Sequence, residues 1–470
     1  MKRNLLIRIF SAVVVIAMSA TAMAQAAAPA QVFQLPAFQH LKLPNGLTLL
    51  LLEKHELPLI SVELALRSGS VADPQGKEGV AFLTASLLRK GTASRSSEQV
   101  SSDLDFIGMQ YDSRADQDST HLSADFLKKD LDSALAVLGD VVLHPTFPDD
   151  EVKKKIAQQQ DSVRSAKDNA GQVMQLYFMK FLYGDHPYGR PAYGDERSLA
   201  NIRRDDIAGF YRENYTPGNA VIAVSGDFDS AALQTKIAQV FGSWSGKAPT
   251  RKPVPALKAV SGKRVLLVDK PDATQTYFMI GNIGITDTNP DRGPISVVNT
   301  LFGGRFTSLF NTELRIKSGY SYGAFSYFDE LKSPGPFIMY TFTKNATTEP
   351  AIDKSFEVLG RLHKDGFTAD ELASAKTYIN GSLPPQYETT PQLARTMTDL
   401  ELTGITREQF NQNLVKLQGT TQADSHRLIE TYFPSQDFVM VLIGKASEIQ
   451  KIAAKYAPNL ATKKISDPGF

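Results

Sequence analysis

Apolar residues recur along this 470-residue chain in two ways, every second residue in some segments and every third or fourth in others. The first spacing predicts strands and the second predicts helices. Residues 149–166 follow helical spacing through Val152, Ile156 and Val163, and their acidic start is typical of a helix N-terminus. Strand-like apolar runs occur at residues 47–52, 61–66, 221–225, 264–268 and 438–443. The mixture predicts an α+β fold.

The same succession of patterns occurs twice. Val137-Leu-Gly139 precedes a helix start rich in Asp and Glu, and Val358-Leu-Gly360 does the same. Tyr215-Thr-Pro217 and Tyr432-Phe-Pro434 each break the chain before an apolar strand that ends at glycine. Matched positions are separated by 217 (215 to 432) to 221 (137 to 358) residues. A spacing this steady indicates two copies of one α+β unit.

The repeat divides the chain into an N-terminal unit at residues 36–245 and a C-terminal unit at 261–457. Residues 246–260, rich in Pro and Lys, predict an extended linker between them. Residues 1–24 have a basic start, an apolar run and a small-residue end at Ala22-Met-Ala24, which predicts a cleaved signal peptide. We therefore expect a periplasmic or secreted protein without a membrane anchor after cleavage.

Composition excludes several classes of function. The formal net charge of +1 gives no support for a nucleic-acid-binding protein. The absence of cysteine rules out disulfides, thiolate zinc sites and cysteine nucleophiles, and agrees with an oxidising compartment. No two of the seven histidines lie within five residues, so neither H-E-x-x-H nor its inverted form occurs.

A serine-hydrolase string, Gly319-Tyr-Ser-Tyr-Gly323, matches G-x-S-x-G. The nucleophile elbow needs a strand before the serine and a helix after it. Here a helical stretch precedes it and an alternating strand follows, so we reject the match. Gly303-Gly304 before Arg305 lacks the spacing of a phosphate-binding loop and predicts a tight turn. No nucleophile or acid–base pair stands out in the sequence.

Residues 79–92 read GVAFLTASLLRKGT and predict a helix with a glycine stop. The stretch resembles the metal-binding helix of the insulinase/pitrilysin family of zinc peptidases (inverzincins), in its mitochondrial-processing-peptidase-like branch. The family pattern is G-[LIV]-A-H-F-L-E-H-x-L-F-K-G-T. Phe82 and Ser86 stand at its two histidine positions and Ala85 at its glutamate position. The positions that match are Gly79, Ala81, Leu88, Lys90, Gly91 and Thr92.

The third zinc ligand of the family, a glutamate on a later helix, falls near Ser162. Residues 183–191, YGDHPYGRP, resemble the family sequence after that helix, and the resemblance extends over residues 41–457. It implies two homologous α+β units, each a mainly antiparallel sheet packed with helices, that form a clam-shell half-chamber. Because zinc needs at least three protein ligands, we expect this chain to bind no metal and no other cofactor.

Residues 314–322, LRIKSGYSY, resemble the family segment L-R-x-K-x-G-x-x-Y. The resemblance assigns Arg315 to the substrate backbone and Tyr322 to the oxyanion, with the zinc on a partner chain. The chain then resembles the non-zinc subunit of a heterodimer with an H-x-x-E-H paralogue, and peptides or small unfolded proteins are the substrate. The alternative is an inactive peptide-binding or structural scaffold that uses a strand edge at residues 108–112. Under neither reading is the chain a metallopeptidase on its own, and homodimer formation stays open.

Overall fold

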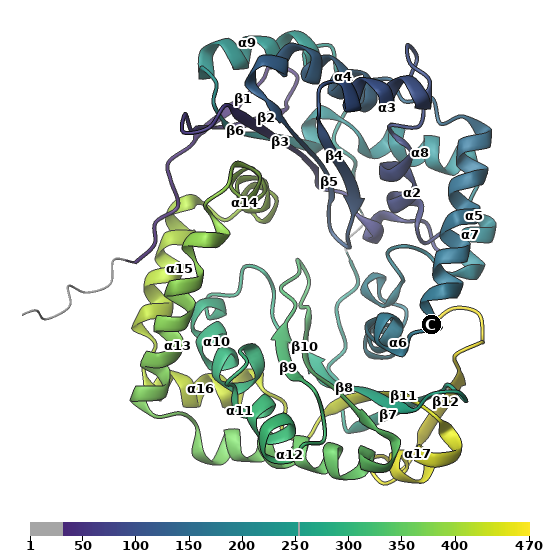
Figure 1. Ribbon diagram of the computed structural model, residues 1–470, viewed down its shortest axis with the longest axis vertical. Coiled ribbons are helices and arrows are strands. Elements are labelled where there is room, and N and C mark those ends of the chain that lie inside the picture. Colours follow the sequence, from purple (N-terminus) through teal and green to yellow (C-terminus); the bar gives the residue numbers. More distant parts are fainter. Residues whose placement is uncertain (1–31, 252–253) are drawn as a thin grey trace, which may run out of the picture. The chain divides into compact units, whose positions relative to one another are not determined.

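The computed structural model describes residues 32–251 and 254–470. The predicted signal peptide lies outside these residues. Two six-stranded sheets organise the described chain, in the orders β1-β2-β6-β3-β5-β4 and β12-β7-β11-β8-β10-β9 (Figure 1). The first sheet consists of β1 Gln39–Lys42, β2 Thr48–Glu53, β3 Leu59–Leu66, β4 Gln110–Ala115, β5 Thr120–Leu127 and β6 Ala220–Gly226. The second consists of β7 Lys263–Asp269, β8 Gln275–Ile283, β9 Ala324–Phe328, β10 Pro336–Lys344, β11 Phe438–Gly444 and β12 Leu460–Lys464.

Helices follow the strands in the same succession in both halves of the chain. In the first half they are α2 Val80–Leu87, α3 Ser97–Phe106, α4 Leu131–Leu143, α5 Asp149–Ala166, α6 Ala170–Tyr183, α7 Glu196–Asn201, α8 Arg204–Asn214 and α9 Ser230–Phe241. In the second half they are α10 Arg292–Asn299, α11 Leu309–Asn311, α12 Thr348–Asp365, α13 Ala369–Ser382, α14 Thr390–Thr403, α15 Arg407–Gly419, α16 Gln422–Tyr432 and α17 Ala446–Ala453, with π-helical turns at Thr300–Gly304 and Thr312–Lys317.

The strand pairing is mixed in both sheets, with antiparallel pairs in the majority. β2 pairs parallel with β6, and β7 pairs parallel with β11, at equivalent places in the two sheets. The sheets differ at one edge, where β1 is antiparallel to β2 but β12 is parallel to β7. The α+β fold and the two related sheets expected from the sequence are confirmed. All five strand-like runs and the helix at Asp149–Ala166 are present.

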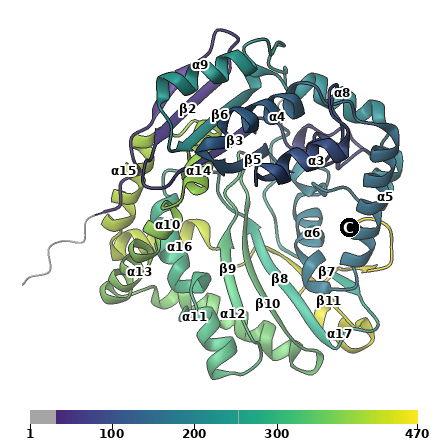
Figure 2. The same cartoon turned by 45° about the horizontal axis from the view of Figure 1, so that its top comes forward.

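Each sheet has one face covered by helices of its own half of the chain. A hydrophobic cluster joins the first sheet to α2, α4 and α9, and a second cluster joins the other sheet to α10, α12 and α16. Alternation explains this arrangement, because Ile60, Val62 and Leu64 of β3 all point to one face. Figure 2 shows α3, α4 and α9 together on the side of the first sheet away from the second.

The opposite face of each sheet is covered by a helix from the other half. Helix α6 packs against β8 and β11 of the second sheet, and α14 packs against β3 and β6 of the first. The two helices occupy equivalent places in the succession of elements, so the exchange is reciprocal. Figure 1 shows α14 beside the first sheet and α6 beside the second.

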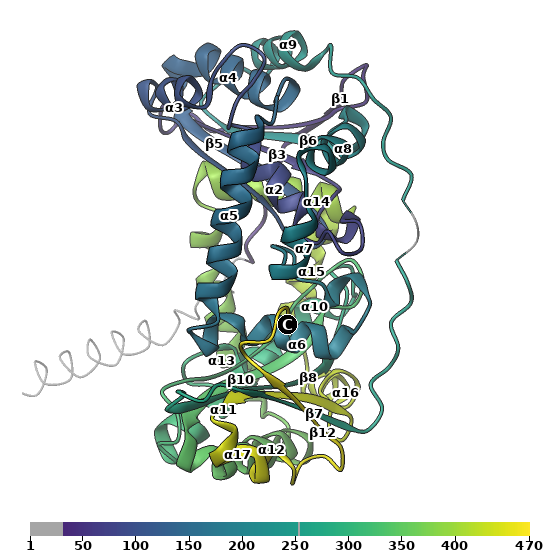
Figure 3. The same ribbon diagram turned by 90° about the vertical axis from the view of Figure 1, so that its right-hand side faces the viewer.

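Between α9 and β7 the described residues form neither helix nor strand, and Figure 3 shows this segment as extended chain. It contains the predicted linker. None of the helices in residues 32–251 and 254–470 has the length and apolar character needed to cross a membrane.

Candidate functional site

Helix α2 is the frame helix expected from the sequence. Its N-terminus is capped by the buried carboxylate of Asp73, which accepts hydrogen bonds from the backbone N–H groups of Gly79 (2.7 Å) and Ala81 (2.8 Å). Gly79 has a φ of 101°, and a Cβ there would lie 3.0 Å from the backbone nitrogen of Gly194, so only glycine fits. Burial raises the pKa of Asp73 to about 8. The helix ends at Leu87, before Gly91, whose φ of 138° turns the chain away.

Side chains without metal-binding groups occupy the ligand positions on α2. The half-buried ring of Phe82 packs edge-on against Tyr193, with centroids 5.0 Å apart, and the Lys155 ammonium lies 5.3 Å from its centre. Ala85 is fully buried, and Ser86 offers only a hydroxyl. A phenyl ring and a lysine therefore stand where the resemblance places a metal ligand.

The fourth position also lacks a metal-binding group. Ser162 of α5 is exposed, and its hydroxyl donates a hydrogen bond to the carbonyl of Gln158 at 2.9 Å. The methyl group of Ala85, the ring of Phe82 and the hydroxyls of the two serines do not fit zinc, which binds imidazole, carboxylate or thiolate ligands. Within the described residues, no three His, Asp or Glu side chains gather as a metal site.

A cavity of about 810 Å³ borders this region. Ser162 and Tyr193 line it, so one of the four ligand and base positions, Ser162, faces an open volume. Its wall is rich in amide side chains: Gln75, Gln117, Gln159, Gln172, Gln175 and Asn201. Amides both donate and accept hydrogen bonds, so this wall is suited to peptide groups.

Arg315 lies in the π-helical turn before β9. Its guanidinium stacks on the ring of Phe306 at 4.7 Å and has no acidic partner among the described residues. Tyr322 is 75% exposed. In the described chain, no hydrogen bond connects Arg315 with Tyr322. Both groups can meet a ligand, and no described residue shields most of Tyr322 from water.

Ser321, the serine of the rejected hydrolase string, is buried. Its hydroxyl donates to the carbonyl of Gly323 at 2.8 Å and accepts from Thr341 at 2.9 Å. The π-helical turn before it and β9 after it follow the order expected from the sequence. These contacts, one within the turn and one to Thr341 of β10, hold the hydroxyl inside the fold and give no exposed nucleophile.

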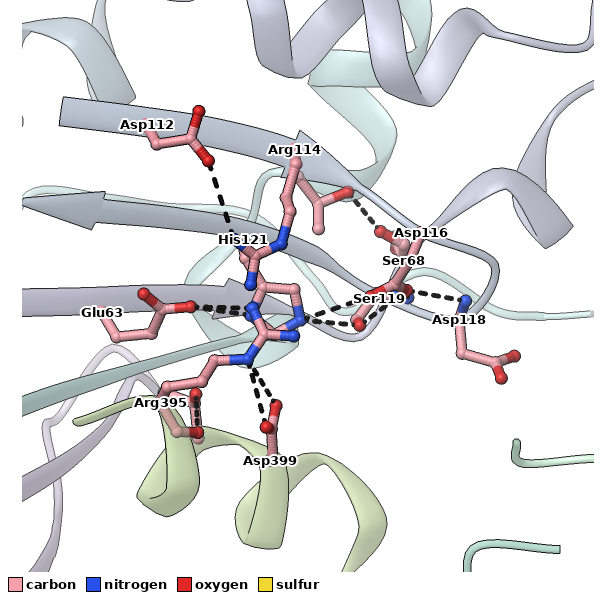
Figure 4. A network of polar contacts seen from close by, with 12 residues as sticks. Glu63, Ser68, Asp112, Arg114, Asp116, Asp118, Ser119, His121, Arg395 and Asp399 are labelled. Atoms are coloured by element: carbon pink, nitrogen blue, oxygen red, sulfur yellow. Dashed lines mark hydrogen bonds and ion pairs between the residues drawn. The ribbon is translucent and has the colours of Figure 1, made fainter. Parts of the chain in front are cut away.

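A polar network that the sequence did not reveal connects the first sheet to α14. His121 of β5 contacts Glu63 of β3 through Nδ1 (2.9 Å) and Ser119 through Nε2 (2.8 Å). Arg395 of α14 donates to the same Glu63 oxygen at 3.2 Å and pairs with Asp399 at 3.0 Å. Figure 4 shows Arg395 directed from the helix toward Glu63 and His121.

Part of this network could have been found from the sequence. Ser119 and His121 are two residues apart in an alternating segment, so they share a face. Glu63 belongs to a strand almost sixty residues earlier, and only the β3–β5 register, which pairs Ala65 with His121, makes it a diagonal neighbour.

The strand edge proposed for peptide binding is also present. β4 is the last strand of the first sheet and pairs only with β5 among the described strands. The strand starts at Gln110, so residues 110–112 of the expected edge lie in it and Gly108 and Met109 precede it.

The two sheets, the exchanged helices and the frame helix define a duplicated peptidase-like fold. Residues 49–196 match the family described as Insulinase (Peptidase family M16), and residues 201–379 match the Peptidase M16 inactive domain. The chain belongs to the M16 (insulinase) peptidase family.

Relatives with known sequences and structures agree with this assignment. The uncharacterised zinc protease YmxG of Bacillus subtilis is 24% identical over 74% of this chain and 83% of its own length. An uncharacterised zinc protease of Mycobacterium leprae is 26% identical over 73% of this chain and 77% of its own. The crystal structure of a peptidase M16 inactive domain from Pseudomonas fluorescens has a TM-score of 0.82 and 25% identity, covering 87% of this chain and 98% of that one. A Helicobacter pylori protease shares the fold, with a TM-score of 0.80 at 20% identity over 87% of this chain and 100% of that one.

Proposed function

We propose that this chain is the non-zinc, substrate-binding subunit of an exported heterodimeric zinc metallopeptidase that cleaves peptides or small unfolded proteins. The observation that carries the proposal is a selective loss. Phe82 and Ser86 stand at the two histidine positions and Ala85 at the glutamate position of a frame helix that is otherwise intact. Arg315 and Tyr322 are retained. The family and the named zinc proteases among its relatives support proteolysis as the context.

The roles of the retained pair follow from their chemistry. A guanidinium presents several fixed donors to peptide carbonyls, and Arg315 has no acidic partner in the described chain to occupy them. A phenol donates to a developing oxyanion, an interaction that is strong where water is excluded. Because Tyr322 is 75% exposed here, a partner chain that carries the zinc would also supply the missing cover.

The test is reconstitution with an H-x-x-E-H paralogue from the same genome. The mature chain alone should bind no stoichiometric zinc and cleave no peptide, and the mixture should cleave. Arg315→Ala or Tyr322→Phe should lower turnover of the mixture by about 10²- to 10³-fold, the range for a lost oxyanion donor. Matched controls are Arg212→Ala and Tyr378→Phe, at exposed positions elsewhere. Unchanged turnover in both site variants would reject the roles of the pair.

Export is part of the proposal and has its own measurement. Fractionation of the native host should place the chain outside the cytoplasm, and its N-terminal sequence should begin after Ala24. A chain recovered from the cytoplasm with Met1 or Lys2 as its first residue would contradict export.

A second candidate function is a peptide-binding scaffold without catalytic partnership. The free edge of β4 supports it, because an extended peptide can add a strand to such an edge. Calorimetric titration of the isolated chain with extended peptides, compared with activity of the mixture, separates the candidates. Tight binding with no activity in any mixture would favour the scaffold.

A further inference from the structure

Three side chains of the polar network have the relative geometry of a nucleophile, a base and an orienting acid. The Ser119 hydroxyl lies 2.8 Å from His121 Nε2, and His121 Nδ1 lies 2.9 Å from Glu63 Oε1. A serine is activated when a histidine within hydrogen-bond reach takes its proton and a carboxylate fixes the other ring nitrogen. Such a group is recognised by geometry and not by its order in the chain.

The fold holds the base and the acid rigidly. His121 is 2% exposed and Glu63 is 4% exposed. Arg395 of α14 donates a hydrogen bond to Glu63 at 3.2 Å, which helps to fix the position of the carboxylate beside His121. Because Glu63 bonds Nδ1, Nε2 is the nitrogen directed to Ser119.

Of the three side chains, only Ser119 lines a cavity, which has a volume of about 410 Å³. Arg395 lines the same cavity, together with Thr396, Leu400 and Tyr387. The volume is at the small end of the range for ligand sites. A short acyl group fits this volume. The guanidinium of Arg395, which pairs with Glu63 and Asp399, forms part of its wall.

We propose that Ser119, His121 and Glu63 form a second reactive site that hydrolyses small acyl esters without a metal. Ser119 Oγ attacks the ester carbonyl while its proton passes to His121 Nε2. The C–O bond to the alcohol then breaks, and the same proton leaves with the alcohol. Water, deprotonated by His121, attacks the acyl-serine, and the acid is released with Ser119 Oγ reprotonated. This activity is separate from the proposed subunit role and needs no partner chain.

Asp116 competes for the serine proton. Its Oδ1 lies 2.9 Å from Ser119 Oγ, and its Oδ2 lies 3.8 Å from His121 Nε2. When both ring nitrogens are protonated, both donate, and the hydroxyl turns to Asp116. When Nε2 is free it accepts from Ser119, and the serine is reactive.

The experiment is labelling of the full mature chain, without partner or metal, by a fluorophosphonate probe, followed by mapping of the modified peptide. We expect one label on Ser119 and release of p-nitrophenol from p-nitrophenyl acetate that EDTA does not affect. His121→Gln should lower the labelling rate by about 10²- to 10⁴-fold, which is the usual contribution of a general base to a reaction rate. Glu63→Gln should lower it by about 10²-fold or more.

Ser123→Ala is the matched control, because Ser123 lies on the same face of β5 two residues beyond His121. It should label as the wild type does. Thermal unfolding of each variant verifies folding, and Ser119→Gly removes the hydroxyl if Ser119→Ala does not fold.

Labelling that persists in a folded Ser119→Ala or Ser119→Gly chain would overturn the proposal. The absence of any label on a folded wild-type chain at every pH tested would also overturn it. The network would then only hold α14 against the first sheet. Neither result bears on the zinc partner, because the assay contains none.

Discussion

Helices α6 and α14 are equivalent elements that cover equivalent sheet faces with different chemistry. α6 packs on the second sheet through a hydrophobic cluster that includes Val173, Met174 and Phe178 of the helix. None of the three hydrophobic clusters of the described residues includes a residue of α14. The same architecture thus closes one face with apolar contacts and the other with a mixture of polar contacts and buried apolar side chains, among them Leu393, Ala394 and Met397 of α14.

The sheet strands explain the difference. The face of β3 turned toward α14 carries Ser61 and Glu63, whereas its opposite face is apolar. Ser61 contacts Thr390 of α14 at 2.8 Å, and Glu63 contacts Arg395. On the second sheet, the equivalent face of β11 carries Val439, Val441 and Ile443.

The comparison shows how a duplicated fold can use one interface, at α6, for stability while the equivalent interface, at α14, contains polar groups that can take part in chemistry. The burial of apolar surface has no directional requirement, so an apolar interface tolerates changes in the orientation of its side chains. A buried polar interface requires specific partners and is costly when one is removed. The proposed reactive serine, its base and its acid all belong to the polar side.

The largest effect is expected from removing apolar volume under α6. Phe178 is fully buried, so Phe178→Ala should lower the free energy of unfolding by about 3–5 kcal/mol. Met397→Ala is the matched change on α14 and should cost less, about 2 kcal/mol, the low end for such a deletion. Denaturant titration measures both. A Met397→Ala loss as large as that of Phe178→Ala would remove the asymmetry.

The next largest effect is expected in the polar interface. Arg395→Met leaves Glu63, whose side chain is 5% exposed, without its cation and should cost about 1–3 kcal/mol. Adding Glu63→Gln should recover part of that loss, because a neutral amide needs no counter-charge. Lys154→Met, at a 65% exposed position, is the control and should change stability by less than about 0.5 kcal/mol. Additive losses in the double variant would show that the two groups are not coupled.

The sequence predicted much of this architecture, because strands and helices leave periodic patterns and a duplicated chain repeats them. Residues 149–166 and all five strand runs were placed within two residues at their ends. The emptied zinc positions on α2 could be identified because Gly79 and Gly91 mark the frame. The roles of Arg315 and Tyr322 stay predictions, since the lone chain leaves Tyr322 facing solvent.

The exchange of α6 and α14 could not be predicted. A helical pattern shows which residues are apolar but not which sheet they meet, and both helices follow their own half in sequence. The network at Glu63 was hidden for the same reason. In the sequence of β3, Glu63 is consistent with a polar residue on an exposed face of the sheet. Only the structure shows that α14 covers this face and buries Glu63.

A smaller effect is expected at the end of α14. Glu401 pairs with Arg67 at 2.7 Å and with His40 at 3.0 Å, and the His40 side chain is 57% exposed. Glu401→Gln should therefore cost only about 0.2–1 kcal/mol. Hydrogen exchange should show faster opening of α14 amides and unchanged protection in α6. Equal acceleration in both helices would mean that they open as one unit.

The smallest expected effect is a pH dependence confined to one interface. Burial raises the pKa of Asp125, on the α14 side of β5, and burial also raises that of Asp399 on α14. A group with a raised pKa in the folded state binds more protons there than in the unfolded chain, so its contribution falls as pH rises. It is fully present below the unfolded pKa and is lost as pH passes through the folded one. Protection of α14 amides should therefore decline with rising pH above about 4.

The matched group at the α6 interface is Asp329, which accepts a hydrogen bond from Gln175 of α6. Burial raises the pKa of Asp329 to about 6. Asp125→Asn with Asp399→Asn should flatten the pH profile of α14 exchange and leave α6 unchanged. Asp329→Asn should flatten the α6 profile up to about pH 6 and leave α14 unchanged. Exchange rates must be corrected for intrinsic chemistry at each pH before the comparison. If either substitution flattened both profiles, the two interfaces would be one cooperative unit, and their different chemistry would have no separate effect on local opening.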